Sequence, residues 1–226
     1  MRELLWSIYY IILNVLTQMD TTEDDALSNL VSNSMGFSLS TGQTSVYLVI
    51  LCLMNFLPFI YSLTKKADDF YCLRRYIVVR SDSWNFHKHF LKKALQKLTV
   101  VNVVKFISEI LICWNLLGYS ETILTIAKVN AMYYIIGVML IGWMELLKVL
   151  SEMSFKKIFA IIAMGIVVLQ YFNHRSILFD LVVTPVSLMT ITNFQTAFIL
   201  RAAFALIISF ALVVAIKARE EKRGVL

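Results

Sequence analysis

Two charged residues within an apolar run are the first candidates for chemistry. Lys105 and Glu109 lie four residues apart in the run 98–117. On a helix this spacing places both side chains on one face, so that the ammonium group can meet the carboxylate. At a rise of about 1.5 Å per residue, Lys105 lies about 10 Å and Glu109 about 16 Å from the start of the run. The pair is therefore predicted to lie deep inside any membrane that the run crosses.

This depth limits what the pair could do. An isolated charge is most costly in the middle of a hydrocarbon layer, and pairing lowers that cost. The face that carries Lys105 and Glu109 should then point away from lipid. There it could line a wet path or close the contact between two subunits. The alternative is an intrahelical ion pair that only makes insertion tolerable, and the spacing leaves both interpretations open.

The chain lacks the common motifs of enzymes. It contains no phosphate-binding lysine motif, no H-E-x-x-H and no G-x-S-x-G. ATP hydrolysis is therefore not expected in this chain, and no catalytic residue, cofactor or metal site is predicted. His87 and His89 are two residues apart and fall on different faces of a helix. They are predicted to be solvated or to face lipid headgroups rather than to bind a metal.

The segment 64–97 is strongly basic. It contains nine lysines and arginines against three aspartates, and the difference, nine minus three, equals the net charge of +6 of the whole protein. Because cations gather on the cytoplasmic side of membrane proteins, this basic segment is predicted to face the cytoplasm. Its first part, 69–79, is amphipathic. Ser81 or Asp82 then suits the N-cap of a helix that continues directly into the run 98–117.

Composition places these features in a membrane protein. The chain has 226 residues, of which 59% are hydrophobic and 16% are charged, and the apolar residues form long runs. Such runs are typical of a polytopic membrane protein rather than of a soluble domain. The positive balance follows from loop charge on an inner membrane face, so no nucleic-acid partner is predicted. Six spans are predicted, over 4–16, 46–63, 98–117, 129–150, 158–172 and 198–216.

Charge in the loops predicts the topology. Residues 20–44 carry four acidic side chains and no cation, whereas the tail 217–223 is rich in lysine and arginine. The first is expected outside and the second inside, which requires an even number of spans. The apolar stretch 177–191, which Asp180 and Pro185 interrupt, is therefore interpreted as short re-entrant helices between the fifth and sixth spans. Pro58 in the second span should kink its helix and free a carbonyl group that neighbouring helices must satisfy.

The predicted fold is thus a single all-α integral-membrane domain over residues 1–226, with six transmembrane helices and both termini in the cytoplasm. Its layout resembles the permease subunit of ABC transporters of the ABC-2 type. Arg80-Ser81 and Trp84, followed by Lys92-Lys93, are similar to the family's start of the third span. Small permeases of Gram-positive peptide or lantibiotic export and immunity systems are the most similar in layout, which implies a multi-pass protein of the bacterial plasma membrane.

The resemblance implies partners and site residues. The segment between the second and third spans would dock on a separate ABC ATPase, which binds the ATP and magnesium that this chain lacks. A second permease subunit, identical or related, would complete the transporter. Lys105 and Glu109 would belong to the transport path or the dimer contact, and Asp180 and Pro185 to an outer gate. The residues expected to dock on the ATPase are Phe70, Leu73, Arg74, Arg75, Ile77 and Arg80.

The expected function is export of a hydrophobic or amphipathic cargo, with a membrane-active antimicrobial peptide as the best fit to spans that contain few charges. One alternative is a non-pumping immunity or scaffold protein that sequesters a peptide in the membrane. A less favoured alternative is an intramembrane enzyme. The basic segment also has a second interpretation, in which its cations only hold anionic lipid. That interpretation suits Lys88, Lys92, Lys93 and Lys97.

Overall fold

The computed structural model describes residues 2–18, 46–73, 83–117, 120–151, 153–172 and 194–224. These residues form helices almost throughout and contain no strand, which confirms the all-α class. The predicted re-entrant stretch 177–191 and the acidic loop 20–44 lie outside the described residues. The helices are α1 (Arg2–Gln18), α3 (Val46–Asn55), α4 (Leu57–Cys72), α6 (Ser83–Leu117), α7 (Ser120–Ser151), α8 (Phe155–Phe172) and α10 (Phe194–Gly224).

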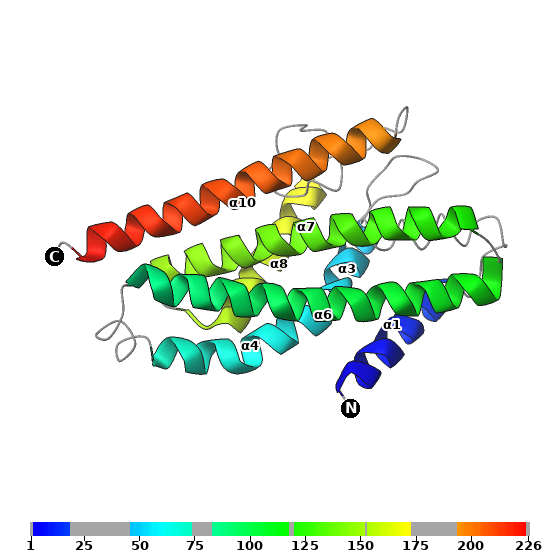
Figure 1. Ribbon diagram of the computed structural model, residues 1–226, viewed down its shortest axis with the longest axis horizontal. Helices are drawn as coiled ribbons and strands as arrows, with labels where there is room; N and C mark the ends of the chain where they lie inside the picture. The colour runs from blue at the N-terminus through cyan, green and yellow to red at the C-terminus, as the bar shows by residue number, and fades with distance from the viewer. Residues whose placement is uncertain are drawn as a thin grey trace.

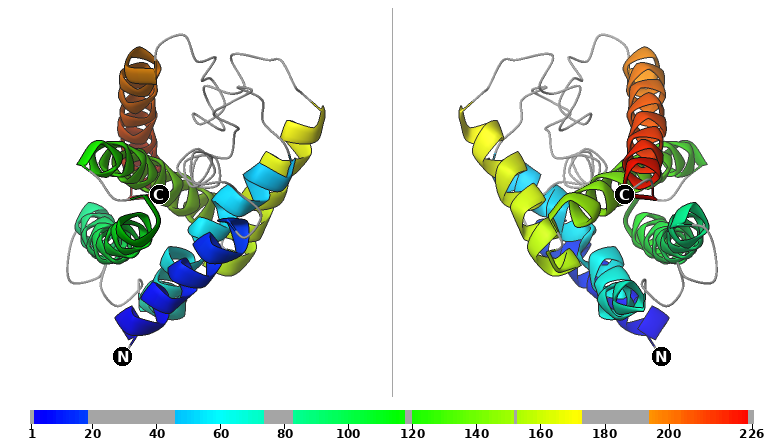
Figure 2. Two further views of the ribbon diagram at one scale, coloured as in Figure 1. Left: turned by 90° about the vertical axis from the view of Figure 1, so that its right-hand side faces the viewer. Right: turned by 90° about the vertical axis from the view of Figure 1, so that its left-hand side faces the viewer.

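The two long helices α6 and α7 form an antiparallel pair at the centre of the structure (Figure 1). α10 lies along α7, while α1 and α4 pack against α6. α3 and α8 contact each other, and α8 also contacts α4 and α7. The end-on views in Figure 2 show α6, α7 and α10 on one side of the molecule and α1, α3 and α8 crossing it on the other. The main hydrophobic core lies where these two groups of helices meet.

α6 confirms the prediction that one helix continues from the basic segment into the third apolar run. It begins at Ser83, directly after the predicted cap Asp82, which lies outside the described residues. Its 35 residues correspond to a length of about 52 Å. One row of buried side chains recurs every three or four residues, as expected for one face of a helix. The row consists of Phe86, Phe90, Ala94, Leu98, Val101, Lys105, Glu109 and Ile112, and His87 and Ser108 are buried beside it.

Small residues bring the central helices close together. A Cβ atom at Gly137 of α7 would lie 2.6 Å from a methyl carbon of Leu98 on α6. A Cβ atom at Gly142 would lie 3.0 Å from a methyl carbon of Leu212 on α10. At the first position glycine leaves room for Leu98, and a larger residue would force that leucine side chain to shift. At the second position it makes room for α10.

One helix in the described part of the chain is long and apolar enough to cross a membrane. It comprises Ile126–Ser151, which is most of α7 and contains the whole predicted fourth span. Leu5–Val15 of α1 is apolar but shorter. Among the described residues, no other predicted span meets the same test of length and composition, so the six-span arrangement stays a prediction.

Pro58 interrupts the second predicted span as expected. α3 ends at Asn55, and α4 begins at Leu57 with the proline in its first turn. Proline has no N–H group, so the Met54 carbonyl loses the donor that a continuous helix would provide. The Tyr9 hydroxyl of α1 donates a hydrogen bond to this carbonyl at 2.9 Å. The prediction that a neighbouring helix satisfies the freed carbonyl is therefore confirmed.

The Tyr9 hydroxyl and Pro58 should be energetically coupled. We expect Tyr9→Phe to lower the free energy of unfolding by about 1 kcal/mol, because it removes one partly buried hydrogen bond. In a Pro58→Ala background the new N–H group of Ala can donate to the Met54 carbonyl. There Tyr9→Phe should lower the free energy of unfolding by clearly less. Thermal unfolding of the four purified variants in detergent measures both costs. Equal costs in the two backgrounds would contradict this account of the helix break.

Candidate functional site

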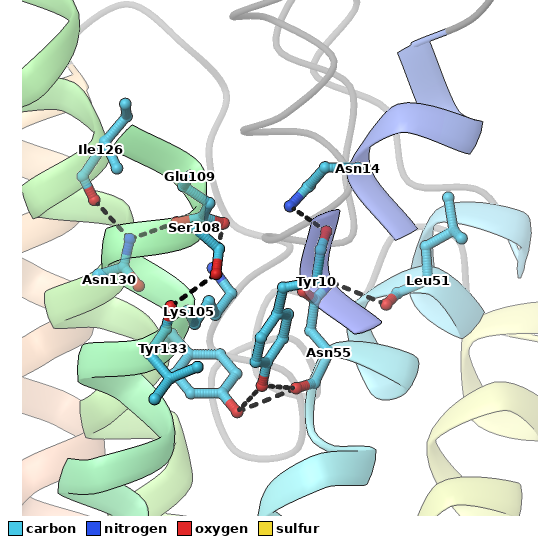
Figure 3. Close-up of polar contacts among 11 residues, drawn as sticks. Tyr10, Asn14, Leu51, Asn55, Lys105, Ser108, Glu109, Ile126, Asn130 and Tyr133 are labelled. Carbon is cyan, nitrogen blue, oxygen red and sulfur yellow. Dashed lines mark hydrogen bonds and ion pairs between the residues drawn. The ribbon is translucent and has the colours of Figure 1, made fainter. Parts of the chain in front are cut away.

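Six buried residues from four helices form a group that we call the polar core (Figure 3). α6 contributes the two charged residues, and α7 contributes an amide and a phenol that face them. α1 and α3 supply a second phenol and the backbone at the helix break. Its members are Tyr10, Asn55, Lys105, Glu109, Asn130 and Tyr133, all of which are buried.

The predicted ion pair lies at one end of the polar core. Lys105 Nζ donates to Glu109 Oε1, and both side chains are fully buried. Asn130 Nδ2 of α7 donates to Glu109 Oε2 at 2.5 Å, so each carboxylate oxygen accepts a hydrogen bond. Lys105 Nζ also lies 5.1 Å from the centroid of the Tyr133 ring, within the range of a cation–π interaction. The prediction of a paired, inward-pointing face is confirmed, while its role in transport stays a prediction.

The other end of the polar core is the Asn55 carbonyl at the helix break. It accepts hydrogen bonds from the Tyr10 hydroxyl at 2.9 Å and from the Tyr133 hydroxyl at 3.0 Å. The ring of Tyr133 stacks on Phe56, with ring centroids 4.3 Å apart. Tyr133 therefore contacts the charged pair through its face and the helix break through its hydroxyl. This arrangement joins α1, α3, α6 and α7 through polar contacts in an otherwise apolar interior.

A second polar cluster, which is buried in part and which sequence reasoning missed, lies where the ends of four helices meet. We call it the inner junction. α4 and α7 contribute their C-terminal ends, and α6 and α8 their N-terminal ends, at the left of Figure 1. Hydrogen bonds and ring contacts connect its members to one another. They are Asp68, Tyr71, His87, Glu145, Lys148 and Phe155.

His87 corrects the prediction of a solvated or headgroup-facing side chain. It is fully buried, and Nδ1 donates to Glu145 Oε1 at 2.6 Å. The Tyr71 hydroxyl donates to the same carboxylate oxygen at 3.0 Å. The prediction was wrong because it considered only whether two histidines could share a metal. The available signal was that His87 follows Phe86 and precedes Phe90 on the apolar face of α6.

Glu145 and Lys148 lie near the end of the predicted fourth span, a position from which the sequence alone predicts that they anchor the span at the membrane interface. For Glu145 this is wrong, because the side chain is fully buried against His87. Lys148 Nζ instead donates to Asp68 Oδ1 at 3.2 Å and to the Met153 carbonyl at 2.7 Å. The ammonium group also lies 5.5 Å from the centroid of the Tyr71 ring. Contacts within the chain therefore hold both charges.

The predicted docking residues fall partly outside the described residues. Arg74, Arg75, Ile77 and Arg80 lie in the stretch 74–82 for which no structure is described, as do Asp180 and Pro185 in 173–193. The structure describes two of the predicted docking residues, Phe70 and Leu73, and they differ in how far they are exposed. Phe70 is half-buried and stacks on Phe86, with ring centroids 4.7 Å apart, whereas Leu73 is 53% exposed.

The lysines of the basic segment also divide into two kinds. Lys88, Lys92 and Lys93 are exposed on α6. Lys97 Nζ, by contrast, donates to the Ser62 carbonyl at 2.5 Å and so connects α6 to α4. In the described part of the chain, no three histidine, cysteine, aspartate or glutamate side chains are grouped so as to hold a metal ion.

Comparisons with protein-family models, with curated proteins and with solved structures found no match for this chain.

The polar core should behave as a compensated charge pair. Lys105→Met leaves the Glu109 carboxylate buried with Asn130 as its neutral donor, and we expect it to cost about 3–5 kcal/mol of stability. The double variant Lys105→Met with Glu109→Leu should recover much of this loss, because no uncompensated charge remains. Thermal unfolding in detergent measures both, with exposed Lys88→Met as the matched control, which should change stability by less than about 0.5 kcal/mol. The prediction would be contradicted if Lys105→Met were as stable as the original protein. It would also be contradicted if the double variant lost more stability than the losses of Lys105→Met and Glu109→Leu added together.

Proposed function

We propose that the chain is the multi-pass permease subunit of an ABC-2-type exporter. The supporting observation is the order of exposed side chains along the helices. On α6 the exposed face carries Lys88 and Lys92 near the N-terminal end and Val103, Ile107 and Leu111 further along. These residues recur at helical spacing, so they form one continuous stripe that changes from cationic to apolar.

The same change occurs on two further helices. α8 exposes Lys156 and Lys157 at its start and then Ile161 and Met164. On α10 the order is reversed, because an exposed apolar run that ends at Val214 precedes the cation Lys217. The cationic ends of α6 and α10 lie at the left of Figure 1, and the beginning of α8 lies left of its centre. A bilayer presents headgroups and then hydrocarbon in this order, whereas water would leave the large apolar side chains unfavourably exposed.

This pattern supports several membrane-crossing helices rather than one. Exposed apolar side chains of α6, α8 and α10 would contact lipid, as would the α1 side chains Leu5, Ile8 and Ile12. The excess length of α6 suits this arrangement, since about 52 Å exceeds the roughly 30 Å of a hydrocarbon core. The first part of α6, with the inner junction, would then project toward the cytoplasm. We therefore retain six spans, both termini in the cytoplasm and a bacterial plasma membrane.

The permease assignment adds partners to this membrane arrangement. An ABC ATPase would supply ATP hydrolysis, and a second permease subunit, identical or related, would complete the path. The cargo would be hydrophobic or amphipathic, such as a membrane-active peptide, because the spans contain few charges and the two in the polar core pair with each other. Among the described docking residues, Leu73 is available to the ATPase, whereas Phe70 is engaged by α6. Ile77 and the three arginines complete the proposed docking face.

Cysteine labelling tests the orientation. In a background without Cys52, Cys72 and Cys113, single cysteines at Asp24 and Ser120 should react with a membrane-impermeant thiol reagent added to intact cells. A cysteine at Ser81 should react only after the cells are permeabilised, because the basic segment is expected inside. Labelling of Ser81→Cys in intact cells, or protection of Asp24→Cys, would reverse the topology.

Docking on an ATPase is tested by co-purification with a co-expressed ABC ATPase and by stimulation of its hydrolysis. Leu73→Ala and Ile77→Ala should weaken both, since truncation of a central apolar anchor can cost about 2 kcal/mol or more of binding energy. Lys92→Ala and Lys93→Ala serve as controls and should have smaller effects, because they are expected to meet lipid headgroups.

Phe70→Ala should instead lower the stability of the permease itself, because its ring packs on α6. If co-purification and stimulation require Lys92 and Lys93 but not Leu73 and Ile77, the docking assignment is overturned. The basic segment would then be better explained as a segment that binds lipid. Correct insertion without any ATPase partner would favour the non-pumping immunity protein.

A further inference from the structure

One carboxylate oxygen in the inner junction connects three helices. Glu145 Oε1 on α7 accepts a hydrogen bond from Tyr71 on α4 and another from His87 on α6. Tyr71 lies in the last turn of α4, and His87 lies in the second turn of α6. The end of α4 and the beginning of α6 therefore meet α7 at a single atom. Neither end can shift relative to α7 without breaking one of these two hydrogen bonds.

The other contacts of the inner junction strengthen this attachment. Asp68 Oδ1 accepts hydrogen bonds from Lys148 Nζ and from the Phe155 amide, each at 3.2 Å, which adds α8 to the same group. The Phe155 ring stacks on Phe90 of α6, with ring centroids 5.2 Å apart. Glu145 and His87 are fully buried, so water cannot replace either hydrogen bond while the junction is closed.

The same helix that holds Glu145 also holds the polar core. Tyr133 and Asn130 precede Glu145 by twelve and fifteen residues, or about 18 Å and 22 Å along α7. Asn130 donates to Glu109, and Tyr133 donates to the Asn55 carbonyl at the helix break. α7 is continuous between these positions. Movement of α7 at Glu145 is therefore transmitted along a continuous helix to the groups that hold the polar core together.

We infer that Glu145 is a positioning residue through which the ends of α4 and α6 control the packing of the polar core. Displacement of either end pulls on Oε1, shifts α7, and loosens the contacts of Asn130 and Tyr133. The inference rests on the proposed function for its biological role, since α4 and α6 flank the segment proposed to dock on the ATPase. The coupling itself is a property of the isolated chain.

Cys52 provides a distant reporter of this coupling. It is buried on α3, three residues before Asn55, and so lies beside the polar core. With Cys72→Ser and Cys113→Ser it is the one thiol left, and its labelling by N-ethylmaleimide requires the core to open. We expect Glu145→Met, which removes the acceptor, to raise the labelling rate about tenfold, or about 1.4 kcal/mol in the opening equilibrium. Tyr71→Phe should raise the rate by a smaller factor.

Conservative variants separate a specific coupling from general damage. Glu145→Gln keeps an oxygen acceptor, and His87→Asn keeps a donor near the position of Nδ1, so both should label at nearly the original rate. Tyr61→Phe removes a hydroxyl from the same helix as Tyr71, but Tyr61 is 57% exposed, and its rate should not change. Phe155→Leu loosens the inner junction but keeps both hydrogen bonds to Glu145 Oε1, so it should raise the Cys52 labelling rate much less than Glu145→Met does.

Two results would overturn the inference. One is that N-ethylmaleimide labels Cys52 at the original rate in both Glu145→Met and Tyr71→Phe. The other is a rate that only follows the fall in Tm, so that Phe155→Leu at a matched Tm labels as fast as Glu145→Met. Because the measurement uses the purified chain in detergent, a missing ATPase partner would refute the proposed function and leave this coupling intact. If the ATPase co-purifies normally but the labelling rate of Cys52 does not change in the Glu145 and Tyr71 variants, the coupling is refuted and the proposed function is not.

Discussion

A charge pair without access to water must be compensated by the protein around it, and this constraint shapes the centre of the structure. Lys105 and Glu109 satisfy each other only in part, because a carboxylate has two oxygens and an ammonium group has three donors. The second oxygen requires Asn130, and the ammonium group lies on the ring of Tyr133. Both residues belong to α7, so compensation of the pair determines how α7 faces α6. The hydroxyl of Tyr133 then extends this constraint to the break between α3 and α4.

Local patterns in the sequence were sufficient to predict several of these features. The spacing of Lys105 and Glu109 predicted their pairing, and Pro58 predicted a broken helix with a carbonyl that needed an outside donor. The continuous helix from Ser83 into the third apolar run followed from a capping residue and an unbroken pattern. Each of these inferences depends on residues close together in the chain, where helix geometry alone fixes which side chains meet.

The inner junction depends on residues that are far apart in the sequence, and it was not predicted. Glu145 is 58 residues from His87 and 74 residues from Tyr71. No local periodicity indicates which helix end will meet another, so both charges at the end of α7 were assigned to the membrane interface. The same limit applies to Phe70, which has the pattern of a docking residue but stacks on Phe86. An amphipathic face predicts that a helix packs against something, without indicating whether that surface belongs to the same chain.

The two glycine contacts of α7 determine which movements of this helix are sterically allowed. Gly137 receives Leu98 of α6, and Gly142 receives Leu212 of α10. Sliding α7 along its axis would place a larger side chain against each leucine, and rotating it would bring Val138 or Met139 toward Leu98. Sliding and rotation of α7 are therefore opposed by these steric contacts. The movement that remains open is a tilt of α7 about the contact of Gly137 with Leu98, which lies between Glu145 at one end and Asn130 and Tyr133 at the other.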